Sequence, residues 1–488
     1  MSPAELMILA VAVPAIGAVL IALTGSRPNV REAVTLVTSA LLAACVYSLL
    51  PTVLAGERPS VELRQMLPGL NIRLELEPLG MVFAGIASLL WPITSLYSIG
   101  YMCGNNEKNQ TRFYLCFAIA LSSAVGVALA GNLLTLFIFY EILSLSTYPL
   151  VAHKGDDNAR LGGRTYIAIL LLTSIGLMLP AIIWTYVATG TLEFAPGGIL
   201  NGHITVAAGA LLLFLYVFGI GKAAVMPVHR WLPAAMVAPT PVSALLHAVA
   251  VVKAGVFCVT KVVIYTFGVD FLATIPAHTV ALYVAGFTVV AASAIALRQT
   301  NLKRLLAYST ISQLSYIVLA ALILTPLSEI GATLHIVAHA FGKITLFFTA
   351  GAIYVASKKT EVTQLRGIGH HMPFTMTAFT IGALSMIGVP PTAGFISKWY
   401  ILGGAFQADS YFVLGVLILS TVLNAAYFLP IVFRAFFYQD EAAGAQSHGE
   451  APTTMVVALS LTATLTLLFF FFNAPVIALA ESLVGGGS

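Results

Sequence analysis

Residues 132–151 read NLLTLFIFYEILSLSTYPLV, an apolar run with one carboxylate, Glu141, near its middle. Twenty such residues form a helix long enough to cross the ~30 Å hydrocarbon core of a bilayer. No other acidic residue lies as deep in an apolar run of this chain. Ionisable groups at that depth are costly and are rarely kept for packing alone. The run therefore predicts a membrane-spanning helix whose carboxylate has either a function or a structural ion-pair partner.

The composition extends this prediction to the whole chain. Its 488 residues are 59% hydrophobic and 9% charged, whereas soluble domains carry about 25% charged residues. The mean hydropathy is +0.96. We expect an all-α polytopic membrane protein with about fourteen spans: 5–23, 32–52, 79–101, 112–130, 132–151, 164–188, 204–225, 241–263, 276–297, 302–325, 328–356, 374–402, 410–434 and 454–480.

The loop charges predict an orientation. With the N-terminus outside, fifteen Lys and Arg residues fall in inner loops and three in outer loops, which is a strong positive-inside bias. We therefore expect both termini on the outer side of a bacterial or archaeal cytoplasmic membrane. Glu5 precedes the first run and no basic segment does, so this run is expected to be a membrane helix and not a cleaved signal.

The remaining composition narrows the function. The four cysteines are scattered without CxxC spacing, and no glycine-rich phosphate loop occurs, so we expect no cofactor and no metal. The basic residues form no dense cluster, so nucleic acid is not an expected partner. The longest polar connection, 53–78, alternates charged and apolar residues and predicts a short hairpin or an amphipathic cover.

A lysine lies at a predicted helix break in the seventh span. Residues 219–227 read GIGKAAVMP, which places Lys222 between Gly221 and Pro227. Broken membrane helices are tolerated where the freed backbone lines a polar cavity. Lys222 is the best candidate partner for Glu141, because spans five and seven can be neighbours in a compact bundle. Whether such a pair gates a proton or only fixes helix packing stays open at this stage.

The next segment is rich in proline and leads into the eighth span. Residues 227–247 read PVHRWLPAAMVAPTPVSALLH and contain four prolines within fifteen residues, including Pro239 and Pro241, so a continuous helix is excluded. His247 and Lys253 follow in the eighth span, six residues apart and on different faces. The two side chains can still line the same hydrated channel, provided that the channel is wide.

The eleventh span carries a polar stripe. Residues 335–343 read HIVAHAFGK, so His335, His339 and Lys343 recur every four residues on one helix face. Metal binding by the two histidines is not expected, because neither an HExxH glutamate nor a third ligand accompanies them. Two interpretations of the stripe remain: hydrogen-bonded structural histidines and a hydrated proton relay. We favour the relay, because histidine titrates near neutral pH.

The twelfth span repeats the pattern of the seventh. Residues 388–400 read GVPPTAGFISKWY and join Lys398 to the helix breakers Pro390, Pro391 and Gly394. Paired interruptions point to inverted repeats around a midplane site. We expect four parts: a three-helix segment, 1–110; a first repeat, 111–265; a second repeat, 266–435; and a last helix, 436–488. Lys261, near a helix end, is expected to reach the interface by snorkelling.

Together these stretches resemble the antiporter-like membrane subunits shared by respiratory complex I, Mrp-type antiporters and membrane-bound hydrogenases. The matching segments are Asn132–Glu141, Lys222–Lys253, Leu302–Tyr316, His335–Lys343 and Gly388–Lys398. The resemblance implies fourteen helices, two inverted five-helix repeats and broken seventh and twelfth helices. It also implies a gating pair of Glu141 and Lys222, a distal exit residue Lys398, supporting residues His229 and Tyr308, and a central relay of Lys253, His247, His335, His339 and Lys343.

The implied function is that of a proton-translocating component of a multisubunit membrane complex. The resemblance implies that a lysine at position 398 is typical of Mrp D-type, hydrogenase-type and some complex I-type components. We expect the D-type component of a sodium/proton antiporter; a component of a complex I-type NADH:quinone oxidoreductase or of a membrane-bound hydrogenase is the alternative. The expected partners are other membrane subunits, lipid and H⁺, with Na⁺ moving elsewhere in the complex. A stand-alone secondary transporter and an inert structural protein remain as rival hypotheses. No catalytic centre is visible in this chain.

Overall fold

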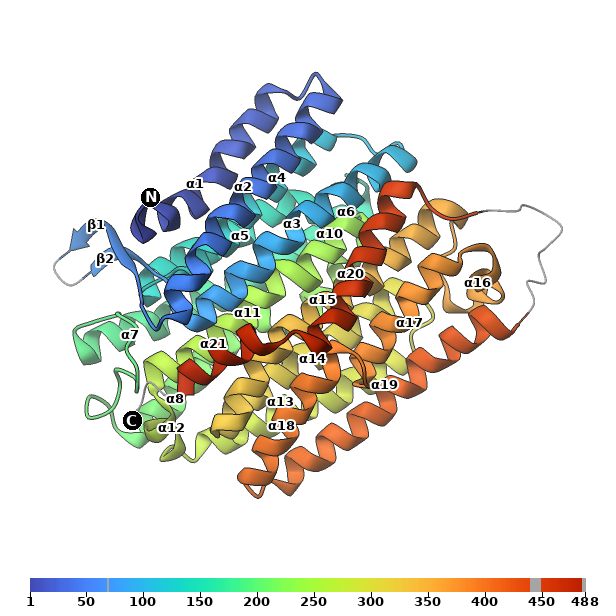
Figure 1. Cartoon of the computed structure of the whole chain (residues 1–488). Helices are drawn as coiled ribbons and strands as arrows, with labels where there is room; N and C mark the ends of the chain where they lie inside the picture. The colour runs from blue at the N-terminus through green and yellow to red at the C-terminus, as the bar shows by residue number, and fades with distance from the viewer. Residues whose placement is uncertain (68–69, 439–448, 485–488) are drawn as a thin grey trace.

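The chain folds into one long bundle of roughly antiparallel helices (Figure 1). The computed structural model describes residues 1–67, 70–438 and 449–484. Within these residues, twelve helices are long and apolar enough to cross a membrane. The predicted polytopic, all-helical class is confirmed.

A β-hairpin joins the second and third helices of the chain. The elements are α1 (Pro3–Leu23), α2 (Pro28–Leu54), β1 (Ser60–Leu67), β2 (Leu70–Glu75) and α3 (Pro78–Gly104). Strands β1 and β2 pair antiparallel, with Ser60 opposite Glu75. The predicted short hairpin in 53–78 is therefore present.

The next part of the chain contains the first broken crossing. Its elements are α4 (Gln110–Ala128), α5 (Leu133–Val151), α6 (Asp157–Thr173), the π segment η1 (Ser174–Met178), α7 (Leu179–Thr189), α8 (Val206–Gly219), the 3-10 turns η2 (Gly221–Ala223) and η3 (Val228–Arg230), α9 (Trp231–Ala234) and η4 (Ala235–Val237). Helix α8 packs on η1, and α9 and η4 pack on α6, so 206–237 forms one interrupted crossing beside α6 and α7.

The central crossing follows as α10 (Thr240–Ala244), the π segment η5 (Leu245–Val249), α11 (Val251–Lys261) and the π segment η6 (Val262–Phe267). The second half then runs through α12 (Val269–Ala273), α13 (Ala277–Leu297), α14 (Leu302–Ile323), α15 (Pro326–Ser357), η7 (Val362–Leu365), α16 (Ile368–His371), α17 (Pro373–Ile387), α18 (Ala393–Gln407) and α19 (Tyr411–Phe437), and ends with α20 (Thr453–Phe471) and α21 (Ala474–Val484).

The second broken crossing is formed by α17 and α18. Residues 388–392 separate the two helices, and Gly388 has φ +90, a left-handed conformation that glycine adopts without strain. With the crossing 206–237, the described residues thus contain two interrupted crossings beside the twelve long helices. Both interruptions lie where the sequence predicts them, at Lys222 and before Lys398.

Buried and exposed helices are sharply divided. The span 240–267 and helix α15 are buried throughout their most apolar windows, whereas α1, α2 and the span 157–189 are largely exposed. Leucines and phenylalanines on the outer helices face outward, as expected for side chains in contact with lipid. The ionisable residues of the span 240–267 and of α15 therefore lie in the middle of the bundle.

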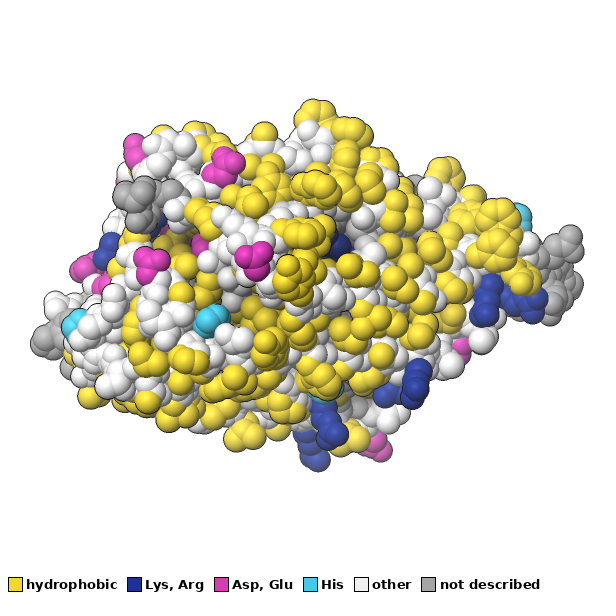
Figure 2. Space-filling view, turned by 90° about the horizontal axis from the view of Figure 1, so that it is seen from below, with side chains coloured by type: hydrophobic (Ala, Val, Ile, Leu, Met, Phe, Trp, Pro, Cys, Tyr) yellow, Lys and Arg dark blue, Asp and Glu magenta, His cyan; other side chains and the backbone are white. Residues whose placement is uncertain are grey.

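The two ends of the bundle differ. We call the end that carries β1, β2 and both chain termini the hairpin end (Figure 1). Figure 2 shows hydrophobic side chains over the middle of the molecule, acidic side chains gathered toward the hairpin end, and most Lys and Arg side chains toward the opposite end.

Candidate functional site

Lys222 is buried at the break after α8 and binds helix α5. Its ammonium nitrogen donates to the carbonyl oxygen of Tyr140 at 2.8 Å and to Oγ of Ser144 at 2.5 Å. The same nitrogen lies 3.1 Å from the centre of the Tyr140 ring. Gly255 allows this arrangement, because a Cβ there would clash with the carbonyl carbon of Lys222. Helix α11 thus packs directly against the backbone of the break.

Glu141 lies beside this contact but does not take part in it. Its side chain is half-buried, and its Oε1 is buried without a hydrogen-bond partner. In the described part of the chain no ion pair joins Glu141 to Lys222, so the expected direct pair is not formed. The reason is helical geometry: positions 140 and 144 lie about 40° apart on the side of α5 toward Lys222, and position 141 is turned about 100° from the first and about 60° from the second.

Burial inside the protein differs from depth along an apolar run, and two other acidic residues are buried at helix starts. Glu77 is 3% exposed and Glu329 is 5% exposed, and both are more buried than Glu141. They lie at the starts of α3 and α15, where the apolar pattern begins and depth is hard to judge from hydropathy.

Lys253 and His339 form the centre of the site. The Lys253 ammonium nitrogen lies 2.7 Å from Nδ1 of His339, and both side chains are 0% exposed. Nε2 of His339 is buried without a partner among the described residues. A proton shared between an amine and an imidazole moves without the breaking of an ion pair.

His335 continues the chain along α15. Its Nδ1 lies 2.8 Å from Oγ of Ser397 and its Nε2 lies 3.1 Å from Oε1 of Gln313. Its ring is 6.3 Å from that of His339 and stacks at 5.5 Å on Tyr316, measured between centroids. The predicted stripe is therefore a connected row of rings and not two isolated histidines.

Lys343 forms the third member of the α15 stripe. Its ammonium donates to Oγ of Ser309 at 2.6 Å, and the hydroxyl of Tyr427 donates to the same oxygen at 2.9 Å. Tyr427 also donates to Asn424. The lysine is 0% exposed and has neutral oxygens as its hydrogen-bond acceptors.

Lys398 lies at the second break, next to the row of rings. Its ammonium donates to the carbonyl oxygens of Met386 at 2.8 Å and Ile387 at 2.9 Å, which the end of α17 leaves free. The same nitrogen is 5.0 Å from the centre of the Tyr316 ring. The structure therefore places the half-buried Lys398 beside the buried Tyr316, His335, His339 and Lys253. These residues, together with Lys343 one turn after His339 on α15, form the central series.

Three predicted residues lie beside this series. Both ring nitrogens of His247 are buried without partners in the described chain, and its ring is 4.7 Å from that of Phe347. His229 lies 6.4 Å from Tyr308, ring to ring, near the end opposite the hairpin. Of the predicted helix breakers, Gly221, Pro227, Pro390 and Pro391 lie in the two interruptions. Pro239 and Pro241 lie instead at the start of α10, and Gly394 lies in the first turn of α18.

Sequence reasoning missed the neutral side chains that connect these groups. Ser309, Gln313 and Tyr316 lie on α14 at spacings of four and three residues, so they share one face. Polar residues at this spacing within an apolar helix could have identified this face from the sequence. Ser144 and Ser397 gave no such signal, because an isolated serine in a helix usually bonds to its own backbone.

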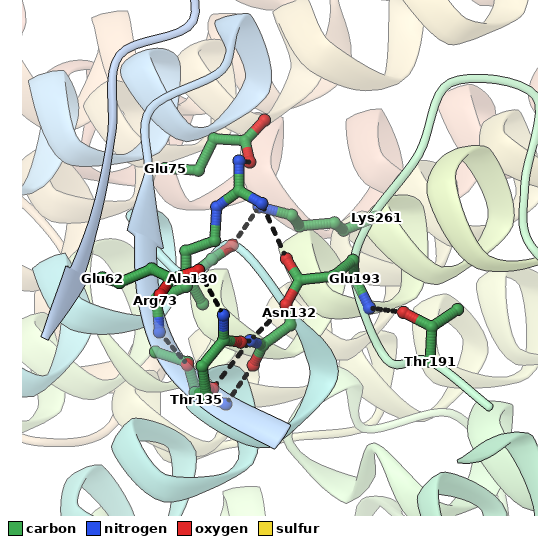
Figure 3. A network of polar contacts seen from close by, with 10 residues as sticks. Glu62, Arg73, Glu75, Ala130, Asn132, Thr135, Thr191, Glu193 and Lys261 are labelled. Carbon is green, nitrogen blue, oxygen red and sulfur yellow. Dashed lines mark hydrogen bonds and ion pairs between the residues drawn. The ribbon is translucent and has the colours of Figure 1, made fainter. Parts of the chain in front are cut away.

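A second polar cluster lies at the hairpin end (Figure 3). Arg73 on β2 pairs with Glu75 at 3.0 Å and with Glu193 at 3.1 Å, and the Asn132 amide donates to Glu193 at 3.1 Å. Burial raises the pKa of Glu75, and the charge of Arg73 opposes that rise. These contacts fix the hairpin to α5 and to the connection before α8.

Lys261 extends this cluster into the bundle. Its ammonium pairs with Oε1 of Glu77 at 3.2 Å and donates to the Ala130 carbonyl at 2.8 Å. Lys261 is 1% exposed, so the prediction that it snorkels to the interface is wrong. The lysine points inward because a buried carboxylate, which hydropathy alone does not reveal, lies beside it.

Comparison with known proteins identifies the family. The profile of the transmembrane family of NADH:quinone oxidoreductase and Mrp antiporters matches residues 130–424, which include both breaks and all the lysines described above. The chain belongs to this family. The match confirms the resemblance inferred from the motifs, and the protein is an antiporter-like membrane protein.

Individual relatives of this family come from both kinds of complex. NADH-quinone oxidoreductase subunit N of Desulforudis audaxviator is 30% identical over 478 residues, covering 93% of this chain and 92% of that protein. The A/B component of a probable K(+)/H(+) antiporter of Rhizobium meliloti is 34% identical over 346 residues, covering 70% of this chain and 33% of that protein.

Solved structures show the same fold. A chain of the membrane-bound sulfane sulfur reductase, an archaeal respiratory membrane complex, superposes with a TM-score of 0.88 at 24% identity and covers 99% of this chain and 98% of its own. A chain of the Mrp complex from Dietzia sp. superposes with a TM-score of 0.87 at 20% identity, covering 100% and 98%. Both are chains of multisubunit membrane complexes.

Proposed function

We propose that this chain is a proton-translocating component of a multisubunit membrane complex. The observation that carries the proposal is a series of ionisable side chains in the bundle: the buried Lys253 and Lys343 and the half-buried Lys398 have no carboxylate partner in the described chain. Desolvated amines without counter-ions are costly and gain nothing for packing. Each lysine instead binds neutral oxygens or an imidazole, which allows it to gain and lose a proton.

In the proposed transfer, charge moves through the middle of the bundle, parallel to the plane of the membrane. A change near Glu141 alters the charge on Lys222, and that charge acts on Lys253 and its partner His339. The shift then passes through His335 and Tyr316 to Lys398, which releases a proton. Sites this close titrate as a coupled set, so the series acts as a unit. One charge crossing the full membrane potential corresponds to about 2.3 kcal/mol per 100 mV.

We propose further that the hairpin end faces outside. The strongly unequal distribution of basic residues between the loops, and their gathering at the opposite end in Figure 2, support this orientation. Both termini then lie outside a bacterial or archaeal cytoplasmic membrane. We also propose that 111–265 and 266–435 are inverted repeats, because each contains one interrupted crossing with a lysine at its break.

We propose that the physiological complex is of the Mrp type, with this chain as its D-type component; the lysine at position 398 is compatible with this but does not distinguish it from hydrogenase-type components. Membership of a complex I-type or hydrogenase-type machine is the alternative, since relatives of the complex I kind also match. We expect H⁺ to move through this chain and Na⁺ to move elsewhere, because a sodium site would require several carboxylate or carbonyl oxygens.

The test uses the assembled complex in proteoliposomes with a pH-sensitive dye. We expect Lys222→Ala and Glu141→Ala each to abolish most proton transport while the complex assembles normally. Lys358→Met, which removes an exposed lysine outside the series, serves as the matched control and is expected to transport normally. Full transport by both alanine variants in normally assembled complexes would overturn the proposal.

A further inference from the structure

A cavity of about 380 Å³ lies at the hairpin end of the bundle. Its wall includes residues after η6, the start of α15 and the end of α21. Four ionisable side chains line it: Arg58, Tyr265, Asp270 and Glu329. Asp270 is exposed, so the cavity communicates with the aqueous phase on that side. No member of the central series described above lines it.

Glu329 stands out among the residues of this cavity. It lies in the first turn of α15 and is only 5% exposed. Its carboxyl group has no hydrogen bond or ion pair to any residue between 1 and 484 that the structure describes. The side chain is buried in the protein, but its carboxyl group lines the cavity. Packing does not explain a carboxyl group at such a place without a protein partner.

Glu77, which binds the cavity residue Tyr265 but does not line the cavity, is a useful contrast. The hydroxyl of Tyr265 donates to its Oε2 at 3.1 Å, and Lys261 pairs with its Oε1. The backbone nitrogens of Leu79 and Gly80 donate to the same carboxylate at 2.8 and 3.0 Å. Protonation of Glu77 would break several of these contacts at once. Protonation of Glu329 breaks none.

Glu329 also lies on the helix that carries the relay. His339 follows it by ten residues on α15, a separation of about 15 Å along the helix axis. Helix α11, whose Lys253 binds His339, leads into η6 and to Tyr265 on the cavity wall. The cavity and the centre of the site are therefore joined by one interface, between α15 and the segment 251–267.

We propose that Glu329 is the proton-exchange residue at the hairpin end, passing protons between the cavity and the Lys253–His339 pair. The proposal rests on the proposed function, because it requires that the central series carries protons. Arg58, Tyr265 and Asp270 are the other charged or titratable groups that face the same cavity. Of the four, Glu329 combines burial with a carboxyl group that has no partner among the described residues.

The first measurement is independent of transport. Dicyclohexylcarbodiimide modifies protonated carboxyl groups in apolar surroundings, and mass spectrometry locates the modified residue. With the intact complex in proteoliposomes, we expect modification of Glu329 and none of Glu77. Absence of modification at Glu329 in a folded complex would overturn the proposal.

The second measurement is proton flux. We expect Glu329→Gln to slow flux at least about tenfold without loss of assembly, and Glu329→Asp to restore part of it. Glu57→Gln removes an exposed carboxylate that does not line the cavity and is the matched control, with flux unchanged. Normal flux in Glu329→Gln overturns the exchange role, as does an equal loss in Glu329→Gln and Glu329→Asp, which would indicate a structural effect.

A Lys253→Met variant distinguishes a failure of the proposed role of Glu329 from a failure of the proposed proton transport by the central series. If Lys253→Met abolishes flux and Glu329→Gln does not, the proposed function stands and the role of Glu329 fails. If Lys253→Met leaves flux intact, the proposed function fails, and with it the role of Glu329 in that function.

Discussion

Lys253 and Lys261 lie on the same helix, eight residues and about 12 Å apart, and both are buried. Lys261 binds the carboxylate of Glu77, which is itself held by backbone nitrogens. Lys253, within the described chain, binds the imidazole of His339 and no carboxylate. One helix thus carries a charge that is paired and fixed and, two turns away, an amine whose proton is free to move.

The same difference separates two regions of the molecule. At the hairpin end, the charged groups Arg73, Glu75, Glu193, Glu77 and Lys261 are joined in ion pairs. In the central series, lysines bind carbonyls, hydroxyls and a histidine. Removing one partner of a buried pair leaves an uncompensated charge, whereas removing a lone buried amine relieves a cost. We therefore expect the ion-paired groups of the hairpin end to contribute stability, and the central series, with Glu329 in its cavity, to contribute transport.

Beyond the losses at Lys222, Glu141 and Lys253, the largest expected effect is a loss of transport at Lys343. Replacing this lysine by methionine removes a titratable group from the series and introduces an apolar side chain of similar length. We expect proton flux to fall about 100-fold or more, as for the loss of a positioned proton-transfer group, with the melting temperature unchanged or raised. Dye-monitored flux and thermal unfolding of the same preparation check this. A lower melting temperature with normal flux would reverse the assignment of the two regions.

The next effect is a loss of stability at Glu77. The change Glu77→Gln leaves Lys261 buried without a carboxylate, at a cost of about 3–5 kcal/mol, so the melting temperature falls while flux per folded complex stays near normal. Adding Lys261→Met removes the orphaned charge and should recover much of the loss. If the double variant is no more stable than Glu77→Gln, the ion pair is not the source of the stability.

A smaller effect tests the packing that places Lys222. In Gly255→Ala the new Cβ would clash with the backbone of Lys222, so the break must shift. We expect a roughly tenfold loss of flux and a modest loss of stability. Gly415→Ala is the control, because nothing lies within 4 Å of a Cβ there. Similar flux in the two variants would show that the position of Lys222 is not critical.

The smallest effect is a pH dependence at Glu75. Because burial raises the pKa of this carboxyl group in the folded protein above its ordinary value of 4.5, the folded state binds the proton more tightly than the unfolded state. Stability should therefore decline slightly as pH rises through the interval just above 4.5, and Glu75→Gln should remove that decline. Melting temperatures measured across this interval provide the check; identical curves for the two proteins would contradict it.

Much of the fold follows from the sequence because hydropathy and helix breakers are local signals. The positions of the spans, the hairpin and both interruptions at Lys222 and Lys398 were predictable from runs of apolar residues, glycine and proline. The α15 stripe followed from a spacing of four residues. These features need no knowledge of which helices are neighbours.

The contacts between helices were not predictable in the same way. The partners of Lys222 depend on how α5 is rotated about its axis. The helix turns Tyr140 and Ser144, and not Glu141, toward the ammonium of Lys222. The partner of Lys261 is Glu77, 184 residues earlier in the chain. Gln313 and Ser397 bind His335 from two other helices. Pairings of this kind depend on packing, which a single sequence does not specify.

The most direct measurement compares Lys253→Met with Lys261→Met, both in the assembled complex, by proton flux and melting temperature. Our account predicts opposite outcomes: Lys253→Met abolishes flux and leaves the complex at least as stable, whereas Lys261→Met lowers the melting temperature and leaves flux per folded complex nearly intact. If both substitutions lower flux and stability to the same extent, a carboxylate partner does not change the role of a buried lysine. The proposed difference between the ion-paired groups of the hairpin end and the proton-carrying central series is then wrong.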